Sequence, residues 1–352
     1  MLKRILRIKL IIGITLIIGL VLTHLITAYV FGKKAEEVLN LQFKTMTNSP
    51  YIVVDHYAYK RGLFSSEISA HLSLNSYGIS NIIKLLPNIN ESEINKHNYY
   101  IQYTTHVTNG LFAGVLDGEF SPTIAVANTN IKYPASLSAL LGKFFGSKSP
   151  LYIKDIINFN KSGSFVISSP SFDYEEALSG VQIVWKGMSL ITKYNPEFTK
   201  FNNQLSIPNF QLHAPNKSDI AIDNLKYISN SEYSKNKVKV GNTDLSLNQI
   251  MVSLSSMSNS NFRLGDLLNM LTGISIADFL NELDAVNPMN FKLTKITYNA
   301  KSIDTDGFFN SQALVNFESL VTESKIYGPL KLDVAVSHVL SNEFSHMIDQ
   351  LT

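Results

Sequence analysis

The sequence predicts a mainly β protein with short helices, in which an N-terminal transmembrane helix is followed by an exported large antiparallel sheet, built as an open barrel or a sandwich-like β-domain. Two observations predict this fold class. The segment from Leu10 to Phe31 contains no Asp, Glu, Lys or Arg. Most of the chain after it alternates apolar and polar residues with a period of two, which is typical of strands that bury one face and expose the other.

The uncharged segment has the length of a membrane span. As a helix that rises 1.5 Å per residue, residues 10–31 would extend about 33 Å, and the hydrocarbon core of a bilayer is about 30 Å thick. Four cations precede the segment: Lys3, Arg4, Arg7 and Lys9. By the positive-inside rule, we expect residues 1–9 to lie in the cytoplasm and the bulk of the chain to be exported after a single pass.

A cleaved signal peptide is the alternative to a retained anchor, with a cut after Ala28. The apolar run is longer than that of a signal peptide, since it continues to Phe31 before Gly32, Lys33 and Lys34. We therefore expect an uncleaved signal-anchor at residues 10–31. The chain contains no cysteine, which excludes a lipid-modified N-terminal cysteine, disulfides and thiol catalysis.

Beyond the anchor we expect a juxtamembrane helix at residues 32–48 and a periplasmic β-rich domain at residues 49–352. The sequence "NSP" at residues 48–50 ends that helix, because proline restricts the residue before it and cannot donate a helical hydrogen bond. Short helices are expected near residues 136–146, 263–283 and 337–351 from their apolar spacing. Such helices would cover an end or an edge of the sheet.

The motif "YKRGLFSS" at residues 59–66 joins two expected strands. We expect a corner in which Gly62 takes φ > 0, Leu63 and Phe64 cap the apolar end of the sheet, and Arg61 bonds to carbonyls or to a carboxylate. A second interpretation is contact of the cations with anionic lipid. The motif residues are Tyr59, Arg61, Gly62, Phe64, Ser65 and Ser66, and the candidate membrane-surface residues are Lys33, Lys34, Lys60 and Arg61.

A charged N-terminus, one apolar span, a short helix and then this Tyr-x-Arg-Gly-Leu-Phe-Ser-Ser motif resemble the YdgA-like family of bacterial inner-membrane-anchored proteins of unknown function. "NGLFAGVLDGEF" at residues 109–120 and "NSQALVNFESLVTESKIYGPLKLDVAVSHV" at residues 310–339 are similar to later blocks of that family. The resemblance implies a bacterial inner-membrane protein with its bulk in the periplasm, and it implies no catalytic residues. Family members commonly continue beyond the last block, so the resemblance implies a short or truncated member.

The sequence shows no local motif for catalysis or for a cofactor. It has no G-x-S-x-G, no H-E-x-x-H and no glycine-rich phosphate loop. The eight histidines are scattered, and Asp304, Asp306 and Gly307 predict a turn, since Val315 stands where a calcium loop closes with a carboxylate. We expect no metal, no cofactor and no enzymatic activity. The alternative is an envelope hydrolase whose residues converge only in the folded chain.

Two functions fit these observations. The first is a non-enzymatic binding or scaffolding role in the cell envelope. The alternative is binding or transfer of a lipid or another hydrophobic ligand in an apolar β-groove, which the 16 Tyr and 20 Phe favour, since a wide one-sided sheet has to cover its apolar face. The expected partners are the inner-membrane bilayer and an unknown envelope protein or lipid, with a homodimer left open. A net charge of +2 provides no basic footprint for nucleic acid.

Overall fold

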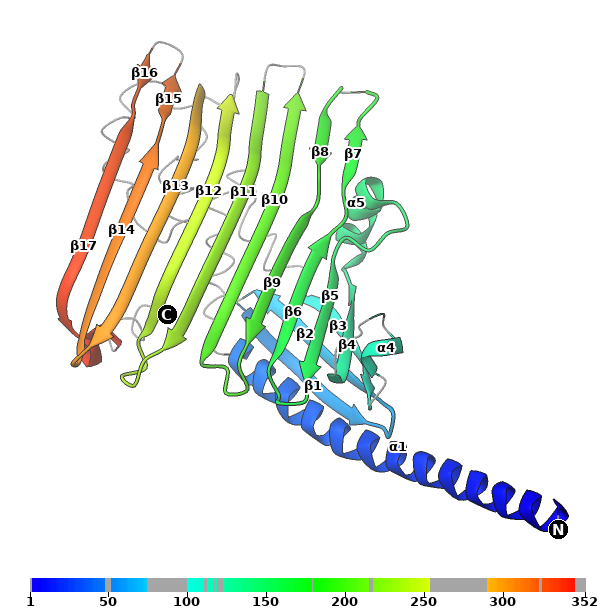
Figure 1. Cartoon of the computed structure of the whole chain (residues 1–352). Coiled ribbons are helices and arrows are strands. Elements are labelled where there is room, and N and C mark those ends of the chain that lie inside the picture. Colours follow the sequence, from blue (N-terminus) through cyan, green and yellow to red (C-terminus); the bar gives the residue numbers. More distant parts are fainter. Residues whose placement is uncertain are drawn as a thin grey trace.

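The structure is a computed structural model that describes residues 2–47, 52–74, 100–110, 113–116, 118, 123–178, 180–214, 218–253, 290–322 and 325–345. These residues form one 17-stranded antiparallel sheet and a long N-terminal helix, α1 (Leu2–Thr47) (Figure 1). Two short helices, α4 (Ala113–Leu116) and α5 (Ala135–Phe145), follow, and residues 341–345 form a further helical turn. The predicted mainly β fold with a large open antiparallel sheet is confirmed.

The strands form two sets along the chain, and the second set contains the four longest strands. The first set is β1 (Ile52–Arg61), β2 (Ser65–Leu74), β3 (Tyr100–Asn109), β4 (Thr123–Lys132), β5 (Tyr152–Asn158), β6 (Gly163–Ser169), β7 (Phe172–Glu175), β8 (Gln182–Trp185) and β9 (Met188–Tyr194). The second set is β10 (Lys200–Ala214), β11 (Ser218–Tyr233), β12 (Lys239–Ser253), β13 (Asn290–Thr305), β14 (Phe308–Phe317), β15 (Ser319–Thr322), β16 (Ile326–Tyr327) and β17 (Leu330–Leu340).

The pairing follows the chain from one end of the sheet to the other. The order is β1-β2-β3-β4-β5-β6-β9-β10-β11-β12-β13-β14-β17. At the upper end of the strands in Figure 1, β8 and β7 extend the sheet beside β10, and β15 and β16 extend it beside β13. The fold is therefore a single long meander whose two ends are β1 and β17.

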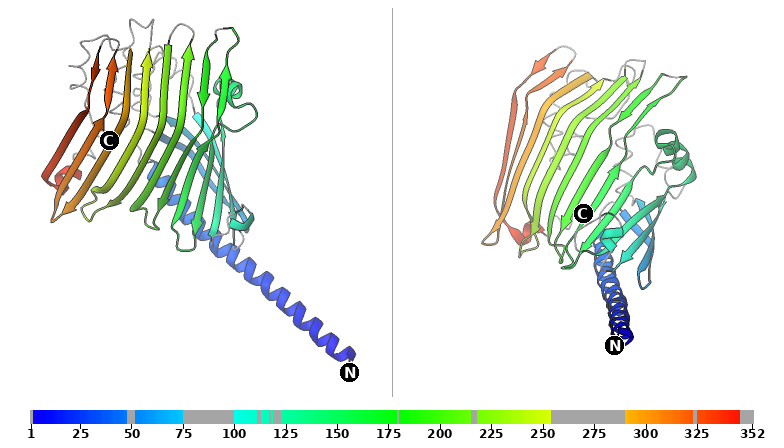
Figure 2. Two further views of the ribbon diagram at one scale, coloured as in Figure 1. Left: turned by 45° about the horizontal axis from the view of Figure 1, so that its top comes forward. Right: turned by 45° about the vertical axis from the view of Figure 1, so that its right-hand side comes forward.

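The C-terminal half of α1 lies inside the curl made by the first part of the sheet (Figure 2). Its residues Ala35, Val38, Leu39 and Phe43 recur at helical spacing and are at most 5% exposed. They pack against Ile68, Ala70, Val107, Ile124, Ala125, Ala127, Ile157 and Tyr194, which lie on β2–β5 and β9. The helix thus supplies the inside of the curl, and the sheet buries the apolar stripe of the helix.

A second apolar cluster lies on the same face of the sheet, over the long strands. Phe201 and Leu205 lie four residues apart on β10, so both point to one face; Phe201 packs against the helix cluster and Leu205 packs against the second cluster. The buried members of that cluster are Leu225, Leu245, Leu247, Ile250, Val252, Phe291, Leu293, Ile296 and Leu320.

A bend crosses the long strands at a common level (Figure 2). The register between β10 and β11 passes from Ile207↔Leu225 to Asn209↔Asp223, and Asn224 has φ 53°. On β13, Lys295 has φ 49° at the same level. At the bend, the buried positions of the strand shift by one residue, since Leu247 and Ile250 of β12 are three residues apart and both are buried. The bend therefore keeps apolar residues on one face along the whole strand, as bulged positions do.

Several element boundaries differ from the prediction. The expected anchor and juxtamembrane helix form one helix, because nothing between Phe31 and Lys44 breaks helical hydrogen bonding. The helix expected at residues 337–351 begins only at Ser341, since pairing with β14 extends β17 to Leu340, and residues 346–352 lie outside the described part. The helix expected at residues 263–283 also lies outside the described residues. Where a helix was expected near residues 136–146, α5 spans Ala135–Phe145.

The expected membrane span falls on α1. Within this segment, the described side chains are those of residues 18–31 except residue 20. Within the part of the chain that the structure describes, no helix combines the length and apolar character that a membrane span requires.

The helix core predicts a matched pair of substitutions. Phe43 is 5% exposed and lies 4.4 Å from the Tyr57 ring and 5.6 Å from the Tyr103 ring, between centroids. Phe43→Ala should lower the free energy of unfolding by about 3–5 kcal/mol, because it removes a buried ring and leaves a cavity. Leu41 lies on the exposed side of the same helix, and its side chain is 39% exposed. Leu41→Ala should therefore lower the free energy of unfolding by less than about 1 kcal/mol. Urea unfolding followed by far-UV circular dichroism checks both, and equal losses would contradict the assigned core.

Candidate functional site

The motif at residues 59–66 contacts α1 at the point where the helix leaves the sheet. The Arg61 guanidinium donates to Glu36 of α1 at 3.0 Å, and its Cζ lies 5.4 Å from the centroid of the Tyr29 ring. Both members of the ion pair are about one-third exposed, so its Coulombic contribution is small. Its geometric effect is larger, because one side chain bridges two turns of the helix.

The turn between β1 and β2 lies along the same helix. Gly62 does not take the expected positive φ; glycine is needed instead because a Cβ there would lie 2.2 Å from the Ser65 carbonyl oxygen. Phe64 was expected to cap the end of the sheet. It stacks instead on His24 of α1, with ring centroids 5.1 Å apart. Leu63 and Phe64 remain 41% and 42% exposed.

The end of β3 completes the contact with the helix. Asn109 donates its backbone N–H to the Phe64 carbonyl at 2.7 Å and its side-chain amide to Ser66 Oγ at 3.0 Å. Gly32 of α1 faces this amide so closely that a Cβ would lie 3.1 Å from Asn109 Nδ2. We call the contacts of Arg61, Phe64 and Asn109 with α1 the helix clamp.

The four candidate membrane-surface cations have different surroundings in the structure. Arg61 belongs to the helix clamp, and the Lys34 ammonium lies 6.0 Å from the Phe31 ring. Lys33 and Lys60 are exposed. Of the motif residues, Tyr59 packs against the helix core, Ser66 is buried, and Ser65 begins β2 at the surface.

A buried carboxylate joins α1 to the sheet further along the helix. Asp155 of β5 is 3% exposed, accepts a hydrogen bond from Gln42 Nε2 at 2.5 Å and another from the Tyr194 hydroxyl at 2.9 Å. Burial raises the pKa of Asp155 to about 6, although these bonds and the Ile156 backbone act in the opposite direction. Burial and the adjacent Asp155 carboxylate raise the pKa of Tyr194.

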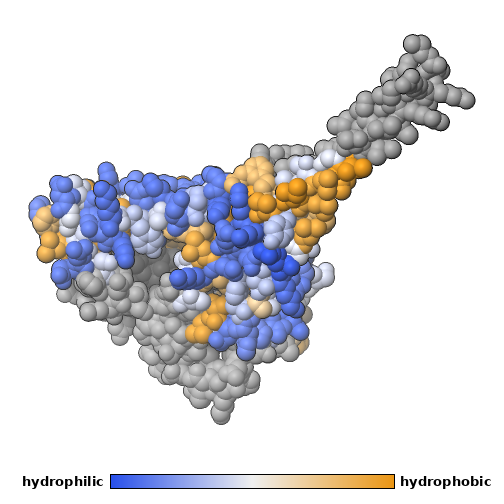
Figure 3. Space-filling view, turned by 90° about the horizontal axis from the view of Figure 1, so that it is seen from below, coloured by the Kyte–Doolittle hydropathy of each residue, from blue (hydrophilic) through white to orange (hydrophobic). Residues whose placement is uncertain are grey.

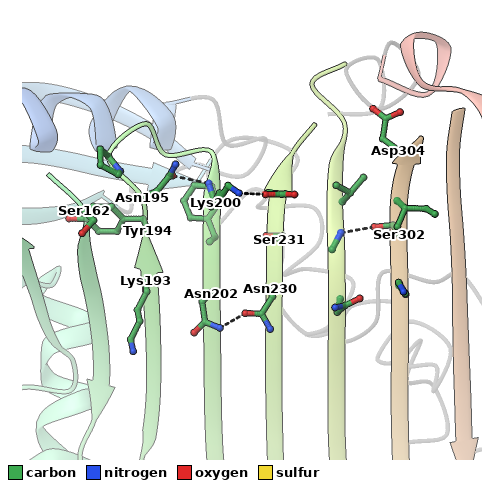
Figure 4. Close-up of a pocket in the computed structure, with 18 of the residues that line it drawn as sticks. Ser162, Lys193, Tyr194, Asn195, Lys200, Asn202, Asn230, Ser231, Ser302 and Asp304 are labelled. Atoms are coloured by element: carbon green, nitrogen blue, oxygen red, sulfur yellow. Dashed lines mark hydrogen bonds and ion pairs between the residues drawn. The ribbon is translucent and has the colours of Figure 1, made fainter. Parts of the chain in front are cut away.

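A hollow of about 840 Å³ opens at the turn end of strands β9–β13, beside Tyr194 (Figure 4). A cross-strand row runs through its lining: Lys193, Asn202, Asn230, Asn242 and Lys301 are consecutive register partners on five neighbouring strands. The next row, with Tyr194 and Phe201, points to the opposite face and into the helix core. The amide row therefore faces away from α1.

The hollow is lined by polar and apolar side chains, and its charges are partly paired. Asn202 donates to Asn230 across the row, and Lys200 pairs with Glu232 at 2.6 Å (Figure 4). Gly241 donates its N–H to Ser302 Oγ at 3.1 Å. Amides and lysine ammonium groups can bind polar or anionic groups, and the acidic and basic side chains in contact, Lys200 and Glu232, form an exposed ion pair.

The histidine and aspartate candidates have separate surroundings. The His71 ring lies 4.9 Å from the His56 ring, between centroids, and the register partner of His106 is Glu67. Asp304 accepts bonds from Ser341 Oγ and Asn236 Nδ2 at the β13–β14 end of the sheet. Within the described part of the chain, no group of three or more His, Cys, Asp or Glu residues could hold a metal.

Sequence reasoning missed Asp155 and the amide row. The burial of Asp155 could have been predicted, because Asp155 lies two residues from both Ile153 and Ile157 on a strand and therefore shares their apolar face. The amide row had none, because its members come together only through the register of five strands.

These features define a class of protein: an open antiparallel sheet curled around one N-terminal helix, with a row of amides and lysines on the face that points away from the helix. The family described as "Bacterial protein of unknown function (DUF945)" matches residues 8–352, and the chain belongs to this family. No curated protein and no solved structure matches the chain.

The buried carboxylate predicts a pH dependence. The pKa of Asp155 is raised to about 6 in the folded chain, so folding disfavours the ionised carboxylate. The protonated carboxyl therefore contributes its full stability to the fold only below the unfolded pKa, near pH 4, and this contribution is lost as pH rises through 6. From pH 4 to 7, wild type should lose about 2 kcal/mol of unfolding free energy relative to Asp155→Asn. Urea unfolding across this range checks it, with the exposed Asp173→Asn as the control. Parallel profiles for wild type and Asp155→Asn would contradict it.

Proposed function

We propose that this protein is a membrane-tethered component of the bacterial envelope that acts by binding or scaffolding and not by catalysis. One observation carries the proposal. A single helix contains both the uncharged segment of residues 10–31 and, a few residues later, the apolar stripe that forms the inside of the sheet. Any membrane insertion of the first part therefore holds the whole β-domain beside the bilayer.

The orientation follows from the flanking charges. Four cations precede the uncharged segment, and Glu36 and Glu37 follow Lys33 and Lys34 on its other side. We infer that the N-terminus is cytoplasmic and that the sheet lies in the periplasm, anchored in the inner membrane.

The amide row and its hollow are the surface we propose for a partner in the envelope. The row faces away from the helix core, and two lysines flank its three asparagines. Such a surface favours polar or anionic groups on a partner protein over an apolar docking face. A homodimer through this face is included in the proposal.

Membrane tethering predicts a change in fractionation. Ile18→Arg combined with Val21→Arg should move the protein from the carbonate-washed membrane pellet to the supernatant, since each arginine near a span centre costs about 2.5–3.5 kcal/mol of insertion free energy. Both positions are 53% exposed, so the β-domain should remain folded. Ile228→Arg, at an exposed position on β11, is the matched control and should stay in the pellet. Wild-type protein in the supernatant would overturn the tether.

A second candidate function is binding of a lipid by the apolar face of the long strands. It is supported by the cluster of leucine, isoleucine and phenylalanine residues that continues on β11–β13 and β15 well beyond α1. Native mass spectrometry on residues 33–352, purified from cell envelopes without added lipid, distinguishes the two functions, because this segment retains the helix residues of the core. One or a few phospholipids per chain would support lipid binding. A clean protein mass, monomeric or dimeric, would contradict it and leave the partner-binding function.

A further inference from the structure

Exposed apolar side chains surround α1 where it leaves the sheet. Leu63 and Phe64 come from the β1–β2 turn, Phe159 from the β5–β6 turn, and Tyr29 and Val30 from the helix itself. Their exposed fractions are 41%, 42%, 39%, 54% and 41%. We call these five residues the collar. Figure 3 shows apolar surface gathered at this point on an otherwise mostly polar face.

The collar reaches back along the helix into the uncharged segment. Phe64 stacks on His24, whereas Phe159 contacts Phe31 with ring centroids 5.2 Å apart. His24 and Phe31 are separated by about 10 Å along the helix axis. The polar side of the β1–β2 turn lies closer to the C-terminal end of α1, where Arg61 contacts Tyr29 and Glu36. Polarity therefore increases along the helix axis, from Phe64 toward Arg61.

The helix before the collar is too short to cross the hydrocarbon core of a bilayer by itself. The part of the uncharged segment that precedes the collar, Leu10 to Thr23, is about 21 Å long as a helix, but a hydrocarbon core is about 30 Å thick. A span that begins at Leu10 and crosses the whole core ends near Tyr29. The bilayer surface then lies at the level of the collar and not below it.

We propose that the collar enters the boundary between headgroups and acyl chains of the bilayer in which α1 is anchored. This inference rests on the proposed function, since it requires the tether. The occupant of the apolar surface is the bilayer, because the collar is continuous with the uncharged segment of the same helix. Aromatic and leucine side chains enter this boundary to a depth of about 5–10 Å, which matches the overlap along α1. Lys33, Lys60 and Arg61 then lie at the level of the headgroups.

The consequence is a fixed orientation of the domain. The helix clamp joins the β1–β2 turn to α1 at Glu36 and His24, so the turn and the span enter the bilayer as one unit. The sheet is then held at one height and one tilt, and not suspended from a flexible stalk.

A single-tryptophan reporter tests the proposal in the full chain. Trp185, the sole tryptophan, lies on β8 at the far end of the strands and is replaced by phenylalanine. Phe64→Trp is then introduced, and the protein is reconstituted in phosphatidylethanolamine and phosphatidylglycerol vesicles with bromine on the upper part of one acyl chain. Tyr152→Trp is the matched control, since Tyr152 is 49% exposed at the opposite end of β5 from Phe159. Leu63→Trp and Phe159→Trp serve as independent reporters if Phe64→Trp does not fold.

We expect the collar reporters to lose roughly half or more of their emission, as side chains within about 5–10 Å of the boundary do, and the Tyr152→Trp reporter to remain unquenched. Collar reporters that match Tyr152→Trp, in protein that resists carbonate extraction, would overturn the collar proposal and leave the tether intact. Protein that carbonate extracts would overturn both.

Discussion

The apolar stripe of α1 is the constraint on which the rest of the molecule depends. Strands β1–β5 and β9 expose one apolar face, and Val38, Leu39 and Phe43 of the helix fill the curl that this face makes. Without the helix, that face would have to close on itself or find another cover. The stripe lies in the same helix as the uncharged segment, so under the tether that we propose the element that completes the fold would also position the domain at the bilayer.

Asp155 adds direction to this packing. Apolar contacts would tolerate some rotation of α1 about its axis, but the carboxylate accepts from Gln42 of the helix and from Tyr194 of β9 at the same time. The bond from Tyr194 holds the carboxylate in place within the sheet, and the bond from Gln42 then fixes the rotation of the helix relative to it. Burial of the carboxylate costs stability, as its raised pKa indicates, so the interaction specifies the arrangement more than it stabilises it. The ion pair between Arg61 and Glu36 fixes the same rotation from the other end of the stripe.

Much of the fold could be predicted from local pattern, and most of the site could not. The period of two located the strands, but the bend at Leu247 and Ile250 appears in the sequence only as an irregular spacing of apolar residues. Gly62 was recognised as a corner, but its reason is a close approach to Ser65 and not a positive φ. The amide row depends on the register of strands far apart in the chain. No one-dimensional pattern encodes such a row, because each asparagine alone is an ordinary exposed strand residue.

The connection between helix and sheet gives these features a common meaning. Only residues 48–51 separate the end of α1 from the start of β1, and the helix clamp and Asp155 hold the helix along its length. A flexible linker would let a tethered domain search a volume, whereas a short, clamped connection presents one surface at one height. The amide row faces away from the helix core and is therefore presented in a fixed direction relative to α1. For the scaffolding role that we propose, this rigidity is an advantage, because a partner would meet the same surface at every encounter.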